Sequence, residues 1–229
     1  MPNPLADLQA RLAYRFADPQ LLTAALTHRS AGAVNNERLE FLGDSVLSCV
    51  ISAALFRLRP ELPEGDLSRL RSRLVRGSAL AVLSAELGLP EVLIMGPGEL
   101  RSGGFQRESI QADAFEAVLG AVYLDGGFAA CEGVILRLYD AHLADLPDTA
   151  TLKDPKTRLQ EWLQARGVAL PSYELVASAG KAHERQFTVA CHVAHANLRV
   201  EARGSSRRKA EQCAAETALG ALHADGGTA

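Results

Sequence analysis

The sequence predicts an all-α domain followed by a small α+β domain with the element order α-β-β-β-α. Up to about residue 146, apolar residues recur three to four positions apart, as on one face of a helix. Beyond residue 154, three alternating apolar and polar segments stand between two helical ones. The charge also changes sign: residues 1–150 hold 13 Arg, no Lys and 19 acidic residues (−6), and residues 151–229 hold 11 Lys and Arg and 8 acidic residues (+3). Two modules with different tasks are therefore expected.

Five segments of the first part carry the helical spacing, with Gly or Pro at the joins between them. They are LADLQARLAYRF (5–16), PQLLTAALTHRS (19–30), ERLEFLGDSVLSCVISAALFRL (37–58), LSRLRSRLVRGSALAVLSAELG (67–88) and SIQADAFEAVLGAVYLDGG (109–127). The longest mostly apolar run, Val46 to Phe56, is shorter than the roughly 20 residues that span a bilayer, so no membrane segment is expected. Four scattered cysteines without a CxxC pair predict reduced thiols and a cytoplasmic protein.

The second part begins after a polar segment bounded by prolines, so residues 147–153 are predicted to be a linker. Asp154 suits the N-cap of the next helix, Pro155 its first position and Gly167 its end. Three predicted strands and a final helix follow: SYELVASAG (172–180), QFTVACHVA (186–194), NLRVEARG (197–204) and SRRKAEQCAAETALGALHA (206–224). The predicted domains are residues 1–146 and 154–225, and the second is one sheet covered by two helices.

Three carboxylates share one side of the third helical segment, at the spacing i, i+3, i+7. They are Glu37, Glu40 and Asp44. Spacing alone leaves open a solvated acidic face. However, Phe41 lies on the same side, which indicates that this side is not wholly exposed to water. A later helical segment repeats the pattern, because Asp113 and Glu116 stand three apart within an otherwise apolar stretch.

Carboxylates flanked by core residues lose part of their hydration, which costs several kcal/mol per ion unless a positive charge compensates. Divalent cations compensate well, and hard oxygen ligands without nearby His or Cys favour Mg²⁺ or Mn²⁺ over zinc. Two acids from each of two helices are suited to hold a pair of ions about 3.5–4 Å apart, the arrangement used to cleave phosphodiesters. The pattern therefore predicts a divalent metal site on these two helices.

The stretch NERLEFLGDSVL (36–47) is close to the hallmark sequence of the ribonuclease III family, which the chain resembles along essentially its whole length. Further blocks match in the same order: ALTHRS (25–30), PEGDLSRLRSRLV (63–75) and GPGELRSGGFQRESIQADAFEAVLGAVYLD (96–125). The resemblance implies catalytic metal ligands at four positions, Glu40, Asp44, Asp113 and Glu116. It also implies a catalytic role for Asp44 and Glu116, and supporting acidic roles at the edge of the cleavage site for Glu37 and Glu64.

The same resemblance implies a homodimer packed around the hallmark helices, with Phe41 at the contact. That contact would explain an apolar side chain on an acidic face. Two positions depart from the family pattern: Asn35 stands where many members have His, and Gln111 where Leu is common. Neither position matches a metal ligand, so activity is expected to survive both departures.

Other polar residues of the first domain have less specific patterns. His28 is interpreted as a hydrogen-bonded structural histidine rather than a base. The glycines of GPGELRSGG (96–104) lack the GK[ST] of a nucleotide loop, so no nucleotide cofactor is expected. The sequence leaves two interpretations of Arg107 open: it contacts a substrate phosphate, or it is an ordinary surface arginine.

The second domain resembles a double-stranded RNA-binding domain in four pieces, DPKTRLQEWLQ (154–164), PSYELV (171–176), GKAHERQFTVACHV (180–193) and GSSRRKAEQCAAETAL (204–219). Such domains read the shape of A-form RNA over about 16 base pairs, through minor-groove and phosphate contacts. The resemblance assigns the RNA contacts to Gln160, Glu161, His183, Arg207, Arg208 and Lys209. The last three open a helix, where cations oppose the macrodipole, so an anionic partner is expected there.

Together these patterns and resemblances predict a cytoplasmic, homodimeric, Mg²⁺-dependent endoribonuclease specific for double-stranded RNA, with Mn²⁺ as a substitute ion. The resemblance implies products with 5′-phosphate and 3′-hydroxyl ends and two-nucleotide 3′ overhangs, and substrates such as ribosomal RNA precursors. The alternative is a catalytically silent dimeric binder of double-stranded RNA, against which the retention of every matched carboxylate speaks. A nuclease for single-stranded RNA or DNA conflicts with a module that reads A-form shape.

Overall fold

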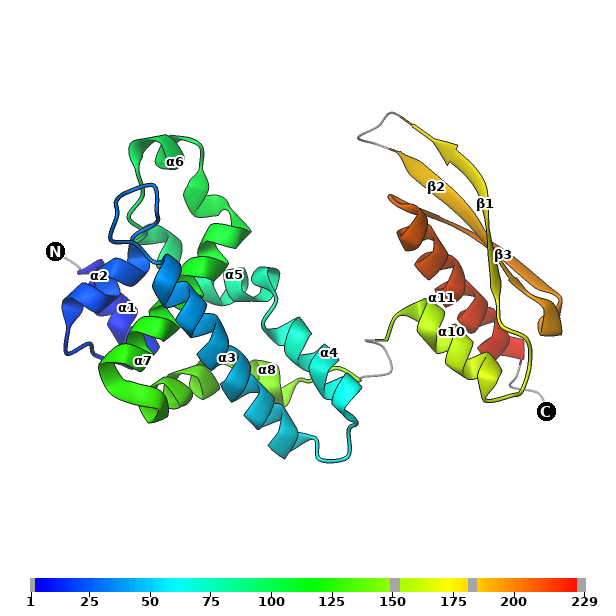
Figure 1. Cartoon of the computed structure of the whole chain (residues 1–229), viewed down its shortest axis with the longest axis horizontal. Coiled ribbons are helices and arrows are strands. Elements are labelled where there is room, and N and C mark those ends of the chain that lie inside the picture. The colour runs from blue at the N-terminus through cyan, green and yellow to red at the C-terminus, as the bar shows by residue number, and fades with distance from the viewer. Residues whose placement is uncertain (1–2, 149–152, 181–184, 226–229) are drawn as a thin grey trace. The chain divides into compact units, whose positions relative to one another are not determined.

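The computed structural model describes residues 3–148, 153–180 and 185–225. They form two compact units, Met1–Pro147 and Asp148–Ala229 (Figure 1). The first unit is helical, and the second joins two helices to a three-stranded sheet. His183 and part of the predicted linker, residues 149–152, lie outside the described residues.

The first unit contains eight described α-helices and two short 3₁₀ turns. They are α1 (Pro4–Leu12), α2 (Pro19–Leu26), α3 (Glu37–Leu58), α4 (Glu64–Leu74), α5 (Gly77–Glu86), η1 (Leu89–Glu91), α6 (Pro97–Arg101), η2 (Gly104–Gln106), α7 (Glu108–Leu138) and α8 (Asp140–Ala144). Local signals set the first two helix starts. The side chains of Asn3 and Asp18 accept hydrogen bonds from first-turn N–H groups, and Pro stands at the first position of each helix.

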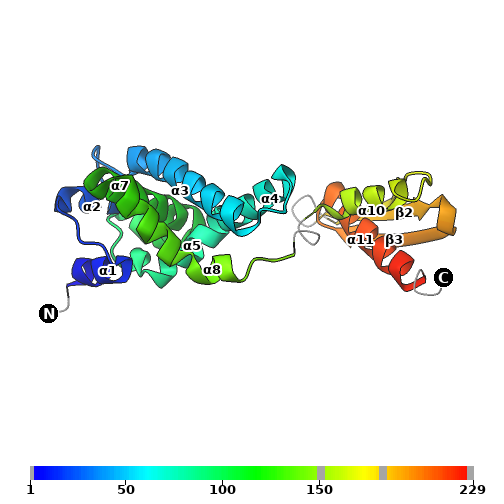
Figure 2. The same cartoon turned by 90° about the horizontal axis from the view of Figure 1, so that it is seen from below.

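The core of the first unit is centred on α3 and α7, which lie side by side (Figure 2). Two glycines set how closely these helices approach. A Cβ atom added at Gly43 of α3 would overlap the backbone carbonyl of Glu116, and one added at Gly120 of α7 would overlap that of Leu39. The two backbones therefore touch where the helices cross, and this contact places Glu40 opposite the acidic turn of α7.

Both central helices are long and apolar enough to span a bilayer by length and composition alone, although the sequence analysis expected no such segment. Their apolar faces pack inside the unit, where Leu47, Ile51, Phe115 and Leu119 are fully buried. The same test is met by core helices of soluble proteins. We therefore interpret α3 and α7 as the core of a folded domain.

The N-terminal segment is held against the far half of α7. The Asp125 carboxylate accepts hydrogen bonds from the Tyr14 hydroxyl at 2.7 Å and from the backbone N–H groups of Ala17 and Asp18 at 2.9 Å each. Farther along α7, the Arg137 guanidinium donates to the carbonyl of Arg11 at 3.0 Å and also to the carbonyl of Leu12. These bonds fix the segment between α1 and α2.

Two helix boundaries differ from the sequence prediction. The segment 67–88 has continuous helical spacing but breaks at Arg76, whose backbone is extended (φ −70°, ψ 148°), so α4 and α5 are separate. The buried Tyr139 hydroxyl donates to the carbonyl of Leu74 at the end of α4, a tertiary bond that periodicity does not reveal. In addition, α7 continues to Leu138 across a kink at Gly127, where φ is 78°.

The second unit has the predicted order: α10 (Pro155–Gln164), β1 (Ser172–Ala179), β2 (Gln186–Val193), η3 (Ala194–Ala196), β3 (Leu198–Gly204) and α11 (Arg207–Asp225). Asp154 caps α10 by accepting from the N–H of Lys156 at 2.9 Å, and Gly167 turns the chain with φ 66°. The antiparallel sheet has the order β1-β2-β3, α11 packs on β2 and β3, and α10 packs along α11. The predicted fold class, a helical domain followed by an α-β-β-β-α domain, is confirmed.

Candidate active site

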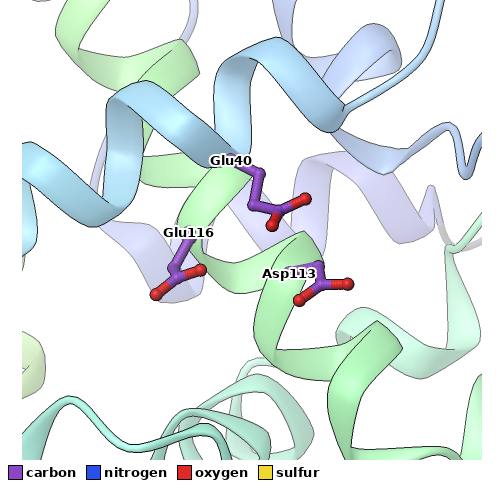
Figure 3. Close-up of side chains that lie close together, drawn as sticks. All are labelled: Glu40, Asp113 and Glu116. Atoms are coloured by element: carbon purple, nitrogen blue, oxygen red, sulfur yellow. The ribbon is translucent and has the colours of Figure 1, made fainter.

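Helices α3 and α7 bring three carboxylates together at their crossing. Glu40 projects from α3, and Asp113 and Glu116 project from successive turns of α7 (Figure 3). One oxygen of each lies within 4.8 Å of the others, and all three side chains are partly buried. Among the described residues, no Lys or Arg forms an ion pair with any of the three. We call these residues the acidic trio.

The surroundings of the acidic trio favour its protonated, uncharged forms. Burial raises the pKa of Glu116 to about 8, and the nearby carboxylates of Asp44, Glu40 and Asp113 add to this shift. Burial also raises the pKa of Glu40, with further increases from Asp113 and Glu37. The pKa of Asp113 is raised by burial too, against the opposing charges of His28 and Arg29. Three carboxylates that repel one another and offer only oxygen atoms suit a hard divalent cation such as Mg²⁺ or Mn²⁺.

Metal binding at the acidic trio should depend on pH, because protons and cations compete for the same oxygens. With its pKa near 8, Glu116 keeps its proton at lower pH and must release it to bind a cation. We expect the affinity for Mn²⁺, measured by calorimetry, to rise by up to about tenfold per pH unit between about pH 6 and pH 8. Glu116→Gln should lose most of that dependence, and a wild-type affinity that does not change with pH would contradict this expectation.

The other predicted acidic residues lie outside the acidic trio. Asp44 is exposed one turn after Glu40, where it accepts a long hydrogen bond from Ser48 Oγ (3.5 Å) and raises the pKa of Glu116. Glu37, at the start of α3, is exposed and pairs with Arg29 at 3.5 Å. Glu64 opens α4 and is exposed, and the described contacts do not join it to the acidic trio.

A cavity of about 280 Å³ adjoins the acidic trio, and Glu40 and Asp113 form part of its wall. His28, Arg29, Asn36 and Arg107 also line it. The backbone of His28 donates to the carbonyl of Ile94 at 2.9 Å, and its Nδ1 bonds the Ser30 hydroxyl at 2.8 Å, as suits a structural histidine. Sequence reasoning missed Arg29 and Asn36 as residues of the site, because only the folded chain brings them beside α7.

The second unit presents the predicted RNA contacts on α10 and α11. Gln160 and Glu161 are exposed on α10, and Glu161 pairs with Lys153 at 2.8 Å. At the start of α11, Arg207 pairs with Glu211 at 3.0 Å, while Arg208 is largely exposed. Lys209 is exposed, and its backbone N–H donates to Ser206 Oγ at 3.1 Å, a helix-capping bond.

The structure adds Lys156, which sequence reasoning missed, to this cationic helix start. Its ammonium pairs with Glu211 at 2.6 Å and lies 4.5 Å from the centre of the Tyr173 ring. Cations from two helices thus surround one carboxylate. A helical domain with an oxygen-only acidic site, followed by an α-β-β-β-α module with cations at a helix start, defines the class of metal-dependent nucleases that act on double-stranded RNA.

Comparison with known families agrees with this class. Residues 18–143 match the ribonuclease-III-like family, and residues 155–222 match the double-stranded RNA binding motif. The chain belongs to the ribonuclease III family and is an endoribonuclease of double-stranded RNA. The enzyme class predicted from the sequence is therefore confirmed, and a catalytically silent binder is not supported.

Similar proteins extend over nearly the whole chain. Ribonuclease 3 of Vibrio cholerae is 52% identical over 219 residues, covering 96% of this chain and 97% of that protein. Ribonuclease 3 of Proteus mirabilis is 53% identical over 213 residues, covering 93% and 94%. The solved nuclease domain of ribonuclease III from Campylobacter jejuni is 40% identical with a TM-score of 0.60, covering 64% of this chain and all of that domain. A second structure of that domain is also 40% identical, with a TM-score of 0.60, and shows structural flexibility in a region involved in dimer formation.

Proposed function

We propose that the chain hydrolyses phosphodiester bonds of double-stranded RNA at the acidic trio together with Asp44, with Mg²⁺ as the cofactor and Mn²⁺ as a substitute. Glu40, Asp44, Asp113 and Glu116 would hold the cations, and Asp44 and Glu116 would be the catalytic pair. The observation that carries this proposal is the convergence of three carboxylate oxygens within 4.8 Å, none of which forms an ion pair with a Lys or Arg among the described residues. Mutual repulsion of this kind is relieved when a divalent ion binds.

Two bound divalent ions would activate a water for attack on phosphorus and stabilise the departing 3′-oxygen. The protein's part is positioning. The carboxylates project from two helices whose backbones touch, so their spacing is fixed before substrate arrives. Glu37 and Glu64 would support cleavage from the edge of the site. We expect 5′-phosphate and 3′-hydroxyl ends with two-nucleotide 3′ overhangs, and substrates that include ribosomal RNA precursors and other structured cytoplasmic transcripts.

We also propose that the enzyme is a homodimer joined through α3. Phe41 and Phe56 are 77% and 71% exposed, and their spacing of 15 residues puts them within about 60° on one helix. Large exposed aromatic side chains on one face are typical of an interface. The dimer-forming region described for the Campylobacter jejuni domain supports this proposal. Sedimentation equilibrium of the purified chain measures the mass that decides it.

We assign catalysis and dimerisation to residues 1–146, RNA binding to residues 154–225, and the connection between them to residues 147–153. Gln160 and Glu161 on α10 would meet one minor groove, and His183 the next. The cations Arg207, Arg208 and Lys209 would meet phosphates. Their location at a helix N-terminus supports this assignment, because backbone N–H groups there also bind anions.

Replacing the two arginines at the start of α11 by alanine (Arg207→Ala with Arg208→Ala) should weaken RNA binding and flatten its dependence on salt. Each lost phosphate contact reduces the slope of log K against log salt concentration by about 0.7–0.9. Filter binding of a hairpin at several salt concentrations measures that slope. Arg166→Ala provides a control, because Arg166 stacks on the Trp162 ring of α10 instead. An unchanged slope in the double variant would remove both arginines from the contact surface.

The proposed reaction is tested by incubating the purified chain with a labelled RNA hairpin, once with Mg²⁺ and once with EDTA. We expect fragments with 5′-phosphate ends in Mg²⁺ and intact RNA in EDTA. A hairpin that is retarded in a gel but remains intact under both conditions would overturn the assigned reaction. Repeating the assay with Mn²⁺ measures whether that ion substitutes.

A further inference from the structure

Asn36, the residue before α3, carries a buried polar group without a partner. The residue is 3% exposed, and its side-chain nitrogen forms no hydrogen bond within the protein. Its backbone is fully used, because the N–H donates to the carbonyl of Thr27 at 2.9 Å and the carbonyl accepts from the N–H of Glu40 at 2.8 Å. Buried amide groups are normally hydrogen-bonded. Asn36 is one of the residues that line the cavity beside the acidic trio, and an acceptor bound in that cavity is the candidate partner for its amide.

Two guanidinium groups line the same cavity. Arg29 comes from the loop after α2, and Arg107 comes from the residue before α7. Each is oriented by a carboxylate outside the acidic trio: Arg29 by Glu37 at 3.5 Å, and Arg107 by Glu99 at 2.8 Å. The segment between α2 and α3, with Arg29 and Asn36, and the distant residue before α7, Arg107, therefore bring N–H donors to the wall of one cavity. Guanidinium and amide donors of this kind are suited to a phosphate oxygen.

We propose that this cavity is a subsite for a backbone phosphate of the RNA strand, next to the phosphate that is cleaved at the acidic trio. The Asn36 amide would donate to a non-bridging oxygen, and Arg29 and Arg107 would supply the positive charge. This proposal rests on the proposed function and refines it. Glu37 and Glu99 hold the two guanidinium groups in place when RNA is absent, and they share them with the phosphate when RNA binds. Such phosphate contacts set the register of the strand rather than its sequence.

The subsite is tested by removing one charge at a time from both partners. Hairpins with a single neutral methylphosphonate at successive positions beside the cleavage site are bound to the full chain, in a Glu116→Gln background that leaves the RNA intact. We expect one position at which the neutral linkage weakens RNA binding about tenfold. In the chain that also carries Arg29→Ala, the same linkage should weaken binding less than about twofold. Arg57→Ala is the matched control: Arg57 is 64% exposed against 70% for Arg29, and it also pairs with a glutamate at 3.5 Å.

The variant Asn36→Leu distinguishes a role of Asn36 in RNA binding from a role in folding. Removal of an unpartnered buried amide should leave the melting temperature unchanged or raise it, while RNA binding weakens at the same methylphosphonate position. A lower melting temperature with unchanged RNA affinity would assign Asn36 a structural role and overturn its part in the subsite. If the binding losses caused by the methylphosphonate and by Arg29→Ala simply add at every position, while the wild-type chain still cleaves the unmodified hairpin, the subsite is overturned. A wild-type chain that leaves the unmodified hairpin intact would overturn the proposed function instead.

Discussion

Replacing Glu116 by glutamine is expected to lower the cleavage rate at least about 10³-fold while RNA affinity stays within about twofold. The side chain is central to the acidic trio, where its pKa is raised by burial and by the carboxylates of Asp44, Glu40 and Asp113. Glutamine keeps the shape but removes the charge that would hold a cation close to the substrate phosphate, where electrostatic stabilisation contributes most to catalysis. Single-turnover cleavage and filter binding of one hairpin measure the two effects separately.

The same substitution should stabilise the metal-free protein at about pH 8. The unfolded chain loses the Glu116 proton near pH 4.5, whereas the folded chain keeps it to about pH 8. The stability present below pH 4.5 is therefore lost as the pH rises towards 8, because the unfolded state binds fewer protons over that range. Glutamine has no carboxyl group to titrate, so the Glu116→Gln variant does not lose this stability. We expect a melting temperature a few degrees above wild type in EDTA, at about 2–4 °C per kcal/mol for a chain of this size.

Glu108→Gln is the matched control, since it makes the same change at the exposed first residue of α7. It should leave cleavage within about twofold, and it should not raise the melting temperature at pH 8, because the Glu108 charge favours the start of the helix. If Glu116→Gln instead lowers the melting temperature and abolishes RNA binding, the residue has a role in folding, and the acidic trio would need a different explanation.

Substituting Gly120 by alanine is expected to damage both stability and cleavage. The added methyl group would overlap the carbonyl of Leu39, so α3 and α7 must separate at their crossing. Overpacking of this kind destabilises by about 1–3 kcal/mol. A displacement of about 1 Å at a catalytic site can reduce the rate about 100-fold. Thermal unfolding and Mg²⁺-dependent cleavage measure the two losses.

Gly133→Ala provides the control for a glycine of the same helix. A Cβ atom at Gly133 would meet nothing within 4 Å, so alanine should be neutral there or stabilise by up to about 1 kcal/mol. A Gly120→Ala variant that is as stable and active as Gly133→Ala would show that α3 and α7 can separate without harm to the site.

The sequence predicted the elements better than their tertiary relations. Helical spacing located α3 over residues 37–58, and the Asp154-Pro155 pair located the start of α10, because both signals are local. The separation of α4 from α5 was not predictable, since the carbonyl at the end of α4 is bonded by Tyr139 from far along the chain.

In the candidate site too, local features were predictable from the sequence and tertiary distances were not. Carboxylates at i, i+3 spacing identified Glu40, Asp113 and Glu116 from single helices, whereas their mutual distances depend on the glycine contact between α3 and α7. The sequence did not identify Asn36 as a site residue, because a polar residue just before a helix is normally a solvent-exposed N-cap. This one is buried, and its side chain makes no capping bond.

The bonds that hold the N-terminal segment also constrain the order in which the first unit assembles. Tyr14 and Asp125 are 111 residues apart along the chain, and Arg11 and Arg137 are 126 apart. Closing a loop of that length costs more entropy than forming a local contact, so contacts of this kind form late. At a synthesis rate of about 5–20 residues per second, the segment around Tyr14 waits roughly 5–20 seconds for its partners to be made. Helix α1 is therefore made before α7 but is among the last helices to be fixed in the nuclease domain.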